Sequence, residues 1–217
     1  MSDTPLYARR VWDPVLRILH WWNALGVLLM IGLGSVILAE DALGLSEAGE
    51  EGLVLVHGSV GFALGAGILA RWLWLFLTPG TASWRDLLPL SAQQRATLAA
   101  TVRYYLGGFR GEPPFYRAHN PLAGLAYLAF FIIAAVQIIT GAVMFTSQEE
   151  LPEALEEIHE VGFFLIAAYV VIHLVMVFVH DAKEHHGLAS SMISGNKLFT
   201  EREFQEHPES QVDEELE

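Results

Sequence analysis

Four long apolar stretches constrain the fold more than any other feature of this sequence. They cover residues 15–39, 53–77, 122–146 and 155–180, and each is close to the roughly 20 residues that a helix needs to cross the hydrocarbon core of a bilayer. Hydrophobic residues make up 53 % of the chain, more than an ordinary soluble domain carries. We therefore predict an all-α protein, a transmembrane four-helix bundle.

The basic residues fall on one side of these spans. With four spans, the segment before the first, the segment between the second and third, and the segment after the fourth share a side; they hold Arg9, Arg10, Arg17, Arg85, Arg95, Arg103, Arg110, Arg117, Lys183, Lys197 and Arg202. The positive-inside rule makes this side cytoplasmic. The sequence thus predicts a multi-pass protein of the bacterial inner membrane with both termini in the cytoplasm.

The two opposite loops are acidic and contain no Lys or Arg. Their acidic residues are Glu40, Asp41, Glu47, Glu50 and Glu51, then Glu149, Glu150, Glu153, Glu156, Glu157 and Glu160. Plain solvation of the periplasmic side explains this acidity, and so does a docking surface for a basic partner. The formal net charge of -13 disfavours nucleic acid as a partner.

The absence of cysteine limits the redox centres that the chain can hold. Covalent c-type haem, iron-sulfur clusters and disulfides are excluded, so any redox centre must be held by histidine or methionine. The first apolar stretch follows arginines, as a secretory signal does. Its length, His20 and the pair Trp21-Trp22 favour a helix that is retained.

Five histidines lie in the predicted spans: His20, His57, His159, His173 and His180. Hydrocarbon penalises an ionisable side chain unless it is paired or liganded. His57 and His159 fall near the periplasmic starts of their helices, and His20 near the cytoplasmic start of the first helix. His173 follows His159 by 14 residues, which places it on the same helix face about 21 Å lower.

These depths give two levels with two histidines each. His57 and His159 form the upper pair, His20 and His173 the lower pair, and each pair offers the two axial imidazoles of a b-type haem. One such histidine is more often a hydrogen-bonded core residue, but four at matched depths favour two haems b. His180 is a rival for the lower ligand, although its position near the membrane boundary favours a solvated, capping or proton-transferring role.

Two further residues fit these levels. Arg71 follows His57 by 14 residues and so faces the lower level. There it is expected to pair with a haem propionate or, alternatively, to reach the interface as a snorkelling arginine. Gly34 faces the upper level, where a missing side chain would let a porphyrin lie close.

The loop between the second and third spans carries polar candidates. Residues 91–106 show the mixed helical spacing of a short interfacial helix or of a plain connector. Asn120 before Pro121 is a helix-start signature, which makes a helix cap one interpretation of Asn120. The other is that His119 and Asn120 donate to a quinone carbonyl at the depth of the lower haem.

The C-terminal end differs from the rest in composition. Residues 200–217 are rich in glutamate and predict a disordered, solvated tail. Residues 1–199 would then form one transmembrane domain.

The sequence contains the following motifs: Leu19-His20-Trp21-Trp22-Asn23, His57-Gly58 with Arg71-Trp72, His119-Asn120-Pro121-Leu122, His159 with His173, and Ser191-Met192-Ile193-Ser194-Gly195. With them the sequence resembles the membrane cytochrome b subunit of respiratory nickel-iron hydrogenases over about residues 8–199. The gamma subunit of formate dehydrogenase is similar in its four-histidine plan. The run Val179-His180-Asp181-Ala182-Lys183 departs from the hydrogenase pattern.

The resemblance implies a subunit with two haems b that exchanges electrons between a periplasmic partner and quinone. By matching positions, the upper pair would ligate the periplasmic haem and the lower pair the cytoplasmic haem, with His119 and Asn120 beside the quinone. Three functions stay open at this stage. The first is an electron-transfer subunit serving a hydrogenase, the second a carrier between quinol and soluble cytochrome c, and the third a haem-free membrane anchor or transporter.

Overall fold

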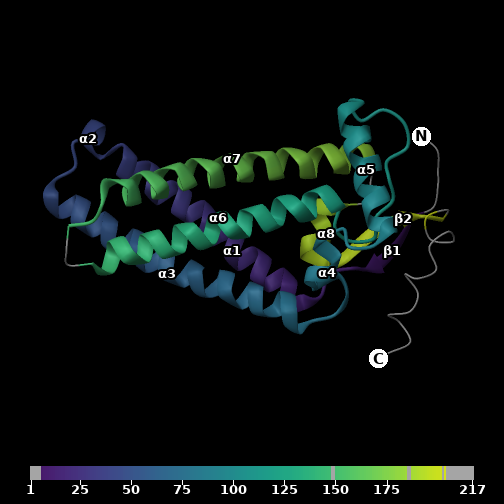
Figure 1. Cartoon of the computed structure of the whole chain (residues 1–217), viewed down its shortest axis with the longest axis horizontal. Helices are drawn as coiled ribbons and strands as arrows, with labels where there is room; N and C mark the ends of the chain where they lie inside the picture. The colour runs from purple at the N-terminus through teal and green to yellow at the C-terminus, as the bar shows by residue number, and fades with distance from the viewer. Residues whose placement is uncertain (1–5, 148–149, 185–186, 202, 204–217) are drawn as a thin grey trace. The chain divides into compact units, whose positions relative to one another are not determined.

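The computed structural model describes residues 6–147, 150–184, 187–201 and 203 (Figure 1). The predicted tail lies outside the described residues from position 204 onward, and so does residue 202.

Four long helices dominate the described chain: α1 (Pro14–Leu38), α3 (Glu47–Leu77), α6 (Pro121–Thr146) and α7 (Glu153–Glu184). Each is long and apolar enough to cross a membrane. The all-α, four-span fold class is therefore confirmed. α3 begins six residues earlier than the predicted span, with Glu47 and Glu50 in its first turn, because carboxylates at a helix N-terminus interact favourably with its exposed N–H groups.

The start of α6 agrees with the predicted cap. Asn120 Oδ1 accepts hydrogen bonds from the backbone N–H of Leu122 at 2.9 Å and of Ala123 at 3.4 Å. Pro121 occupies the first helical position, where its missing N–H costs nothing and its fixed φ suits the helix. The cap interpretation of Asn120 is thus confirmed.

The chain divides into two compact units. The bundle unit contains Ile18–Trp74 and Leu128–His173. The terminal unit contains the described parts of residues 1–17, 75–127 and 174–217.

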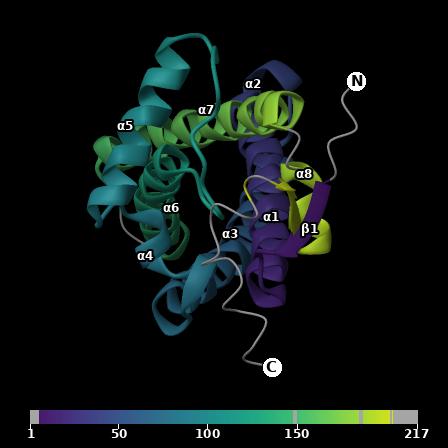
Figure 2. The same ribbon diagram turned by 90° about the vertical axis from the view of Figure 1, so that its right-hand side faces the viewer.

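Segments of α1, α3, α6 and α7 lie side by side in the bundle unit (Figures 1 and 2). Aromatic rings pack between them: Phe130 stacks on Tyr169 with ring centres 4.8 Å apart. Large apolar side chains point outward, among them Leu25, Ile132 and Val171. A water-soluble protein rarely exposes so much apolar surface, whereas lipid tails suit it. The short helix α2 (Glu40–Leu43) joins α1 to α3.

The terminal unit combines short helices with two strands. The helices are η1 (Gly80–Ala82), α4 (Trp84–Leu87), α5 (Ala92–Leu106) and α8 (Leu188–Ser194). α5 confirms the helix predicted over residues 91–106. Ser91 and Gln94 close its first turn as a capping box, in which each side chain bonds the other's backbone N–H.

The strand pair joins the two ends of the described chain. β1 (Leu6–Arg10) and β2 (Asn196–Thr200) are antiparallel, with Leu6 opposite Thr200 and Arg10 opposite Asn196. Neither strand follows from the sequence analysis. Regular structure also continues through Thr200, one residue past the predicted boundary of the tail.

The Ser191 to Gly195 motif connects α8 to the segment before α1 by hydrogen bonds. The indole N–H of Trp12 donates to Ser191 Oγ at 3.0 Å. The backbone N–H groups of Val11 and Trp12 donate to the Gly195 carbonyl at 2.9 and 3.1 Å. Gly195 has a φ of 89°, a conformation that residues with a Cβ atom rarely adopt.

Candidate functional site

The structure brings together the histidines that the sequence places at one depth. In the bundle unit, His57 of α3 and His159 of α7 have ring centres 6.3 Å apart. His20 of α1 and His173 of α7 have ring centres 6.4 Å apart. We call these the upper pair and the lower pair, as above.

Both separations fit two imidazoles that share one metal ion. A metal–nitrogen bond of about 2 Å on each side, plus about 1.1 Å from nitrogen to ring centre, puts the two centres roughly 6 Å apart. Among the described residues, no three His, Cys, Asp or Glu side chains gather into a metal site. The four histidines instead face each other in twos, which is the number of axial ligands that a six-coordinate haem takes.

His159 is oriented by two residues of α6. Thr140 Oγ1 lies 2.8 Å from His159 Nδ1, and Gln137 Nε2 donates to the His159 carbonyl at 2.8 Å. The Thr140 hydroxyl also lies 2.8 Å from the Val136 carbonyl, to which it donates its single hydrogen. Its oxygen must then accept from His159 Nδ1–H, which leaves the Nε2 lone pair available to a metal.

Two close approaches surround the upper pair. A Cβ added at Gly34 would lie 3.1 Å from the Phe163 ring and 3.8 Å from His57 Cε1, and one added at Gly141 would lie 3.0 Å from His159 Cε1. Gly34 therefore lies at the upper level, where the sequence analysis puts it. His57 Nδ1 is buried without a hydrogen-bond partner among the described residues. A buried polar atom of this kind fits a site made for a further group.

The lower pair lies among aromatic rings. Tyr169 stacks on His173 with ring centres 6.0 Å apart and an angle of 10° between the planes. Trp21 meets His20 edge to face at 5.4 Å. Such ring contacts hold the planes of the imidazoles in place.

Arg71 on α3 is 2 % exposed. A snorkelling arginine keeps its guanidinium in water at the interface, so this burial argues against that alternative. Pairing with a haem propionate remains a prediction.

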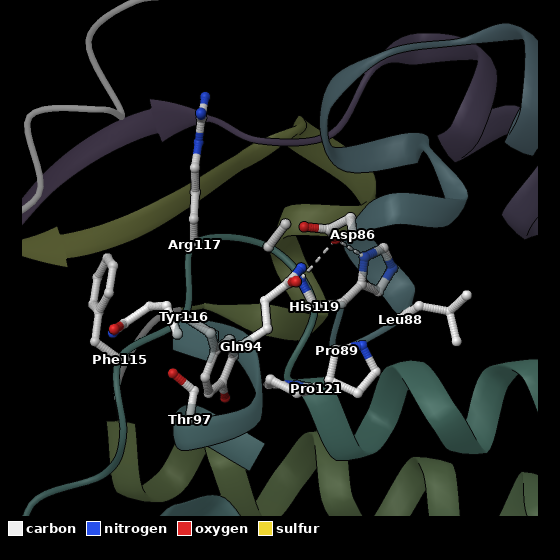
Figure 3. A pocket seen from close by; sticks show the side chains of 12 residues that line it. Asp86, Leu88, Pro89, Gln94, Thr97, Phe115, Tyr116, Arg117, His119 and Pro121 are labelled. Atoms are coloured by element: carbon white, nitrogen blue, oxygen red, sulfur yellow. Dashed lines mark hydrogen bonds and ion pairs between the residues drawn. The ribbon is translucent and has the colours of Figure 1, made fainter. Parts of the chain in front are cut away.

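The terminal unit contains a pocket of about 360 Å³ (Figure 3). It is built from α4 and the residues after it, from α5, and from the loop before α6 with the first residue of that helix: Asp86, Leu88, Pro89, Gln93, Gln94, Thr97, Phe115, Tyr116, Arg117, Ala118, His119 and Pro121. His119, one of the two predicted quinone residues, lines it. Asn120 does not, although both of its neighbours do.

His119 is held by a carboxylate and two rings. Its Nδ1 lies 2.5 Å from Asp86 Oδ2, the contact marked in Figure 3. Trp12 meets its ring at 4.8 Å between centres, and Tyr127 is stacked with it at 6.3 Å. The sequence offered no sign of Asp86, because 33 residues separate it from His119.

His180 belongs to a second polar cluster, which we call the His180 network. Its Nε2 lies 2.6 Å from the Tyr105 hydroxyl, and its Nδ1 lies 2.6 Å from Glu184 Oε1. Tyr116 donates to Glu184 Oε2 at 2.8 Å, and Asn120 Nδ2 donates to the Tyr105 hydroxyl at 2.8 Å. Both ring nitrogens of His180 are therefore engaged with protein groups, which argues against the rival role of His180 as a haem ligand.

Buried charge surrounds this network. Lys197 of β2 is 0 % exposed; its Nζ donates to the Arg117 carbonyl at 3.1 Å and lies 4.9 Å from the centre of the Tyr116 ring. Burial lowers the pKa of Lys197 to about 8, although the negative charges of Glu184 and other carboxylates act to raise it. Burial and the charge of Glu184 raise the pKa of Tyr105 to about 12, and the same causes, in the same order, raise the pKa of Tyr116.

Comparison with known proteins gives a consistent picture. Residues 11–195 match the family model described as prokaryotic cytochrome b561. A probable Ni/Fe-hydrogenase B-type cytochrome subunit of Cupriavidus necator is 24 % identical, over 91 % of this chain and 90 % of the relative. Proteins of the same description from Azotobacter vinelandii (26 % identical, 87 % of this chain and 88 % of the relative) and, as a hydrogenase 1 subunit, from Escherichia coli (22 %, 85 % and 88 %) are also similar.

Proposed function

We propose, because the chain belongs to the prokaryotic cytochrome b561 family and carries two facing pairs of histidines, that it transfers electrons between a redox partner and a membrane quinone. Family membership makes it a membrane cytochrome of the b type, and hence a haem b protein. The separations of 6.3 and 6.4 Å within the two pairs carry the proposal further, to two haems in one chain.

The residues that would hold these haems are the two pairs themselves. His57 and His159 would bind the upper haem, His20 and His173 the lower one, and Arg71 would pair with a propionate. Haem supplies a carrier that takes up and gives back one electron at a time. Thr140 fixes the tautomer of His159, and Tyr169 stacks on His173 and so holds the plane of its ring.

The partner that we propose is a nickel-iron hydrogenase. Relatives aligned over most of their length are described as subunits of such enzymes. The charge distribution supports an orientation with both termini in the cytoplasm of a bacterium, and with the acidic loops at the periplasmic face. The partner would then dock on that face. One observation favours a second candidate, a basic soluble cytochrome c as partner: these loops carry no Lys or Arg.

The quinone headgroup would bind in the pocket of the terminal unit. Its volume of about 360 Å³ lies in the usual range for small-molecule sites. A quinone offers carbonyl oxygens that accept hydrogen bonds, and His119 in the pocket wall is a donor. Asn120 would act from behind the wall, through Tyr105, rather than on the quinone itself.

Haem content tests the two pairs. The full-length protein, purified in detergent, is expected to bind two haems b per chain and to show a b-type band in its reduced-minus-oxidised spectrum. Removing either pair by a double substitution, His57→Ala with His159→Ala or His20→Ala with His173→Ala, should leave one haem. A chain without any haem would contradict the proposal and favour the anchor or transporter.

The partner is tested in membranes of the source bacterium. Loss of this chain should abolish hydrogen-dependent reduction of quinone, and its return should restore it. If hydrogen oxidation is unaffected while quinol-dependent reduction of cytochrome c is lost, the second candidate is correct.

A further inference from the structure

Two histidine–carboxylate pairs lie in the terminal unit, and both are connected to the pocket. His119 and Asp86 line it. His180 and Glu184 lie behind its wall, with side chains only 7 % and 1 % exposed. Tyr116 connects the His180–Glu184 pair to the pocket. It lines the pocket, and its hydroxyl lies 2.8 Å from Glu184 Oε2 and 3.2 Å from His180 Nδ1.

The hydrogen bonds of the His180 network assign its protons. Asn120 donates to the Tyr105 hydroxyl, which is therefore free to donate its own hydrogen to His180 Nε2. With Nε2 as acceptor, Nδ1 carries the ring proton and donates it to Glu184 Oε1. Glu184 then accepts two hydrogen bonds, one from His180 and one from Tyr116, and is ionised.

A buried carboxylate of this kind is a poor device for stability alone. Removing a charge from water costs several kcal/mol, and apolar residues of similar size often replace buried ionic groups without loss. Lys197 supplies a nearby positive charge, which favours the ionised form of Glu184. The network thus holds a carboxylate that is out of reach of bulk water and that can accept one proton through Tyr116.

We propose that Tyr116 and the His180–Glu184 pair relay a proton between the pocket and the interior of the terminal unit when a quinol is oxidised or a quinone reduced there. This inference depends on the proposed quinone function of the pocket. The hydroxyl of Tyr116 does not ionise in the process, because its pKa is raised by burial and by Glu184. It accepts one proton as it gives up another.

The balance is that of a two-electron oxidation. One quinol loses two electrons, which the haems of the proposed function would accept, and two protons, and becomes a quinone. One quinol O–H bond breaks as Tyr116 takes that proton, and the O–H bond of Tyr116 breaks as Glu184 takes the proton it held. The second proton goes to the His119–Asp86 pair. Quinone reduction runs the same steps in reverse.

The test uses the full-length haem-loaded protein in lipid vesicles, mixed rapidly with a short-chain benzoquinol while haem reduction is followed by absorbance. Glu184→Gln keeps the size of the side chain but cannot take the proton, and Tyr116→Phe removes only the hydroxyl. Each is expected to slow haem reduction by quinol at least about tenfold. Dithionite, which needs no proton relay, should reduce the same amount of haem in both variants as in the wild type.

Glu112→Gln is the matched control, since Glu112 is an exposed glutamate of the same loop as Tyr116. It should react at the wild-type rate. A solvent deuterium isotope effect on the quinol reaction should be present in the wild type and in this control. It should change in Glu184→Gln, where the remaining slow step is a different one.

A measurement without redox chemistry completes the test. Infrared spectra of the oxidised protein should contain a carboxylate band that Glu184→Gln removes and that Tyr116→Phe shifts, because the latter deletes a hydrogen bond to Oε2. A band that Tyr116→Phe leaves in place, or a wild-type quinol rate in either variant, would overturn the relay. If the wild type itself fails to react with quinol, the quinone function falls, and the relay with it.

Discussion

In the bundle unit, histidine rings face other histidine rings, whereas in the terminal unit His119 and His180 face carboxylates. His57 and His159 lie opposite each other at 6.3 Å between ring centres. His119 and His180 have carboxylate oxygens 2.5 and 2.6 Å from a ring nitrogen. The first arrangement leaves room for an ion between two neutral imidazoles, and the second leaves a proton between a base and an acid.

The difference shows that the hydrogen-bond partner of a histidine determines whether its imidazole is suited to bind a metal or to exchange a proton. A neutral imidazole whose Nδ1–H is tied to a hydroxyl, as in His159 with Thr140, presents a lone pair to a metal. An imidazole bonded to a carboxylate, as in His180 with Glu184, lies beside a second group that can take up a proton. We therefore expect substitutions in the two units to separate haem content from proton-coupled turnover.

The largest expected effect is the loss of a haem. His159→Ala removes one axial ligand of the upper pair, so the variant should bind one haem b per chain in place of two. His180→Ala, on the same helix, should bind both, because His180 already uses both ring nitrogens for protein contacts. Haem is counted from absorbance per mole of protein. If His173→Ala kept both haems and His180→Ala lost one, the lower pair would be misassigned.

Next comes the pocket histidine. His119→Gln should lower quinol-driven turnover by about a hundredfold, the typical contribution of a positioned acid or base, without changing haem content. The assay is the rate at which quinol reduces the haem of the purified protein, followed by absorbance. Glu112→Gln, at an exposed position in the same loop, serves as the control. Turnover that stays at the wild-type level in His119→Gln would remove His119 from the quinone site.

A pH effect on stability is expected from the terminal unit. The pKa of Lys197 is lowered to about 8 in the folded protein, below that of an unfolded lysine. Between pH 8 and about 10 the unfolded chain therefore binds more protons, and the free energy of unfolding rises with pH by at most about 3 kcal/mol. Below pH 8 the full penalty of the buried charge is present.

Thermal unfolding in detergent, recorded from pH 8 to 9.5, checks this effect. The melting temperature of the wild type should rise over that range, and Lys197→Met should reduce the rise. The interval stops short of about pH 10, where an unfolded tyrosine is half ionised. An equal rise in both proteins would assign the effect to other groups.

The smallest expected effect concerns the hydroxyl behind His159. Thr140→Val keeps the shape of the side chain and removes the acceptor for His159 Nδ1–H, so the affinity for the upper haem should fall about tenfold. Thr146→Val is the matched control on the same helix, because its hydroxyl donates to the Ala142 carbonyl. Haem titration of the two apo variants compares them directly. Equal affinities would show that the hydroxyl does not orient the ligand.

The helical part of the fold could be predicted from local sequence patterns. Each of the four spans is a continuous apolar run, and the pairing of histidines by depth needs only the helix rise and the alternation of spans. The cap at Asn120 was equally readable, since Asn before Pro is a local signal. The spans and the cap depend on residues that are near one another in the chain, and the pairing by depth adds only the order of the spans.

Long-range pairings were not readable in the same way. β1 and β2 have five residues each and lie near opposite ends of the sequence. No local periodicity therefore predicts their pairing. The His180 network joins α5, the loop before α6 and the end of α7. In sequence, Tyr105 and Tyr116 are ordinary tyrosines of a connecting segment. Their role depends on which side chains the tertiary fold brings next to them.

The pairing of β1 with β2 also fixes an order of assembly. A ribosome makes the chain from its N-terminus, so β1 has no partner until residues 196–200 have been synthesised, after all four apolar helices. Lys197 lies within that last strand. The countercharge beside the His180 network is thus the final part to arrive, and a chain cut short before β2 would contain both histidine pairs while leaving Glu184 without it.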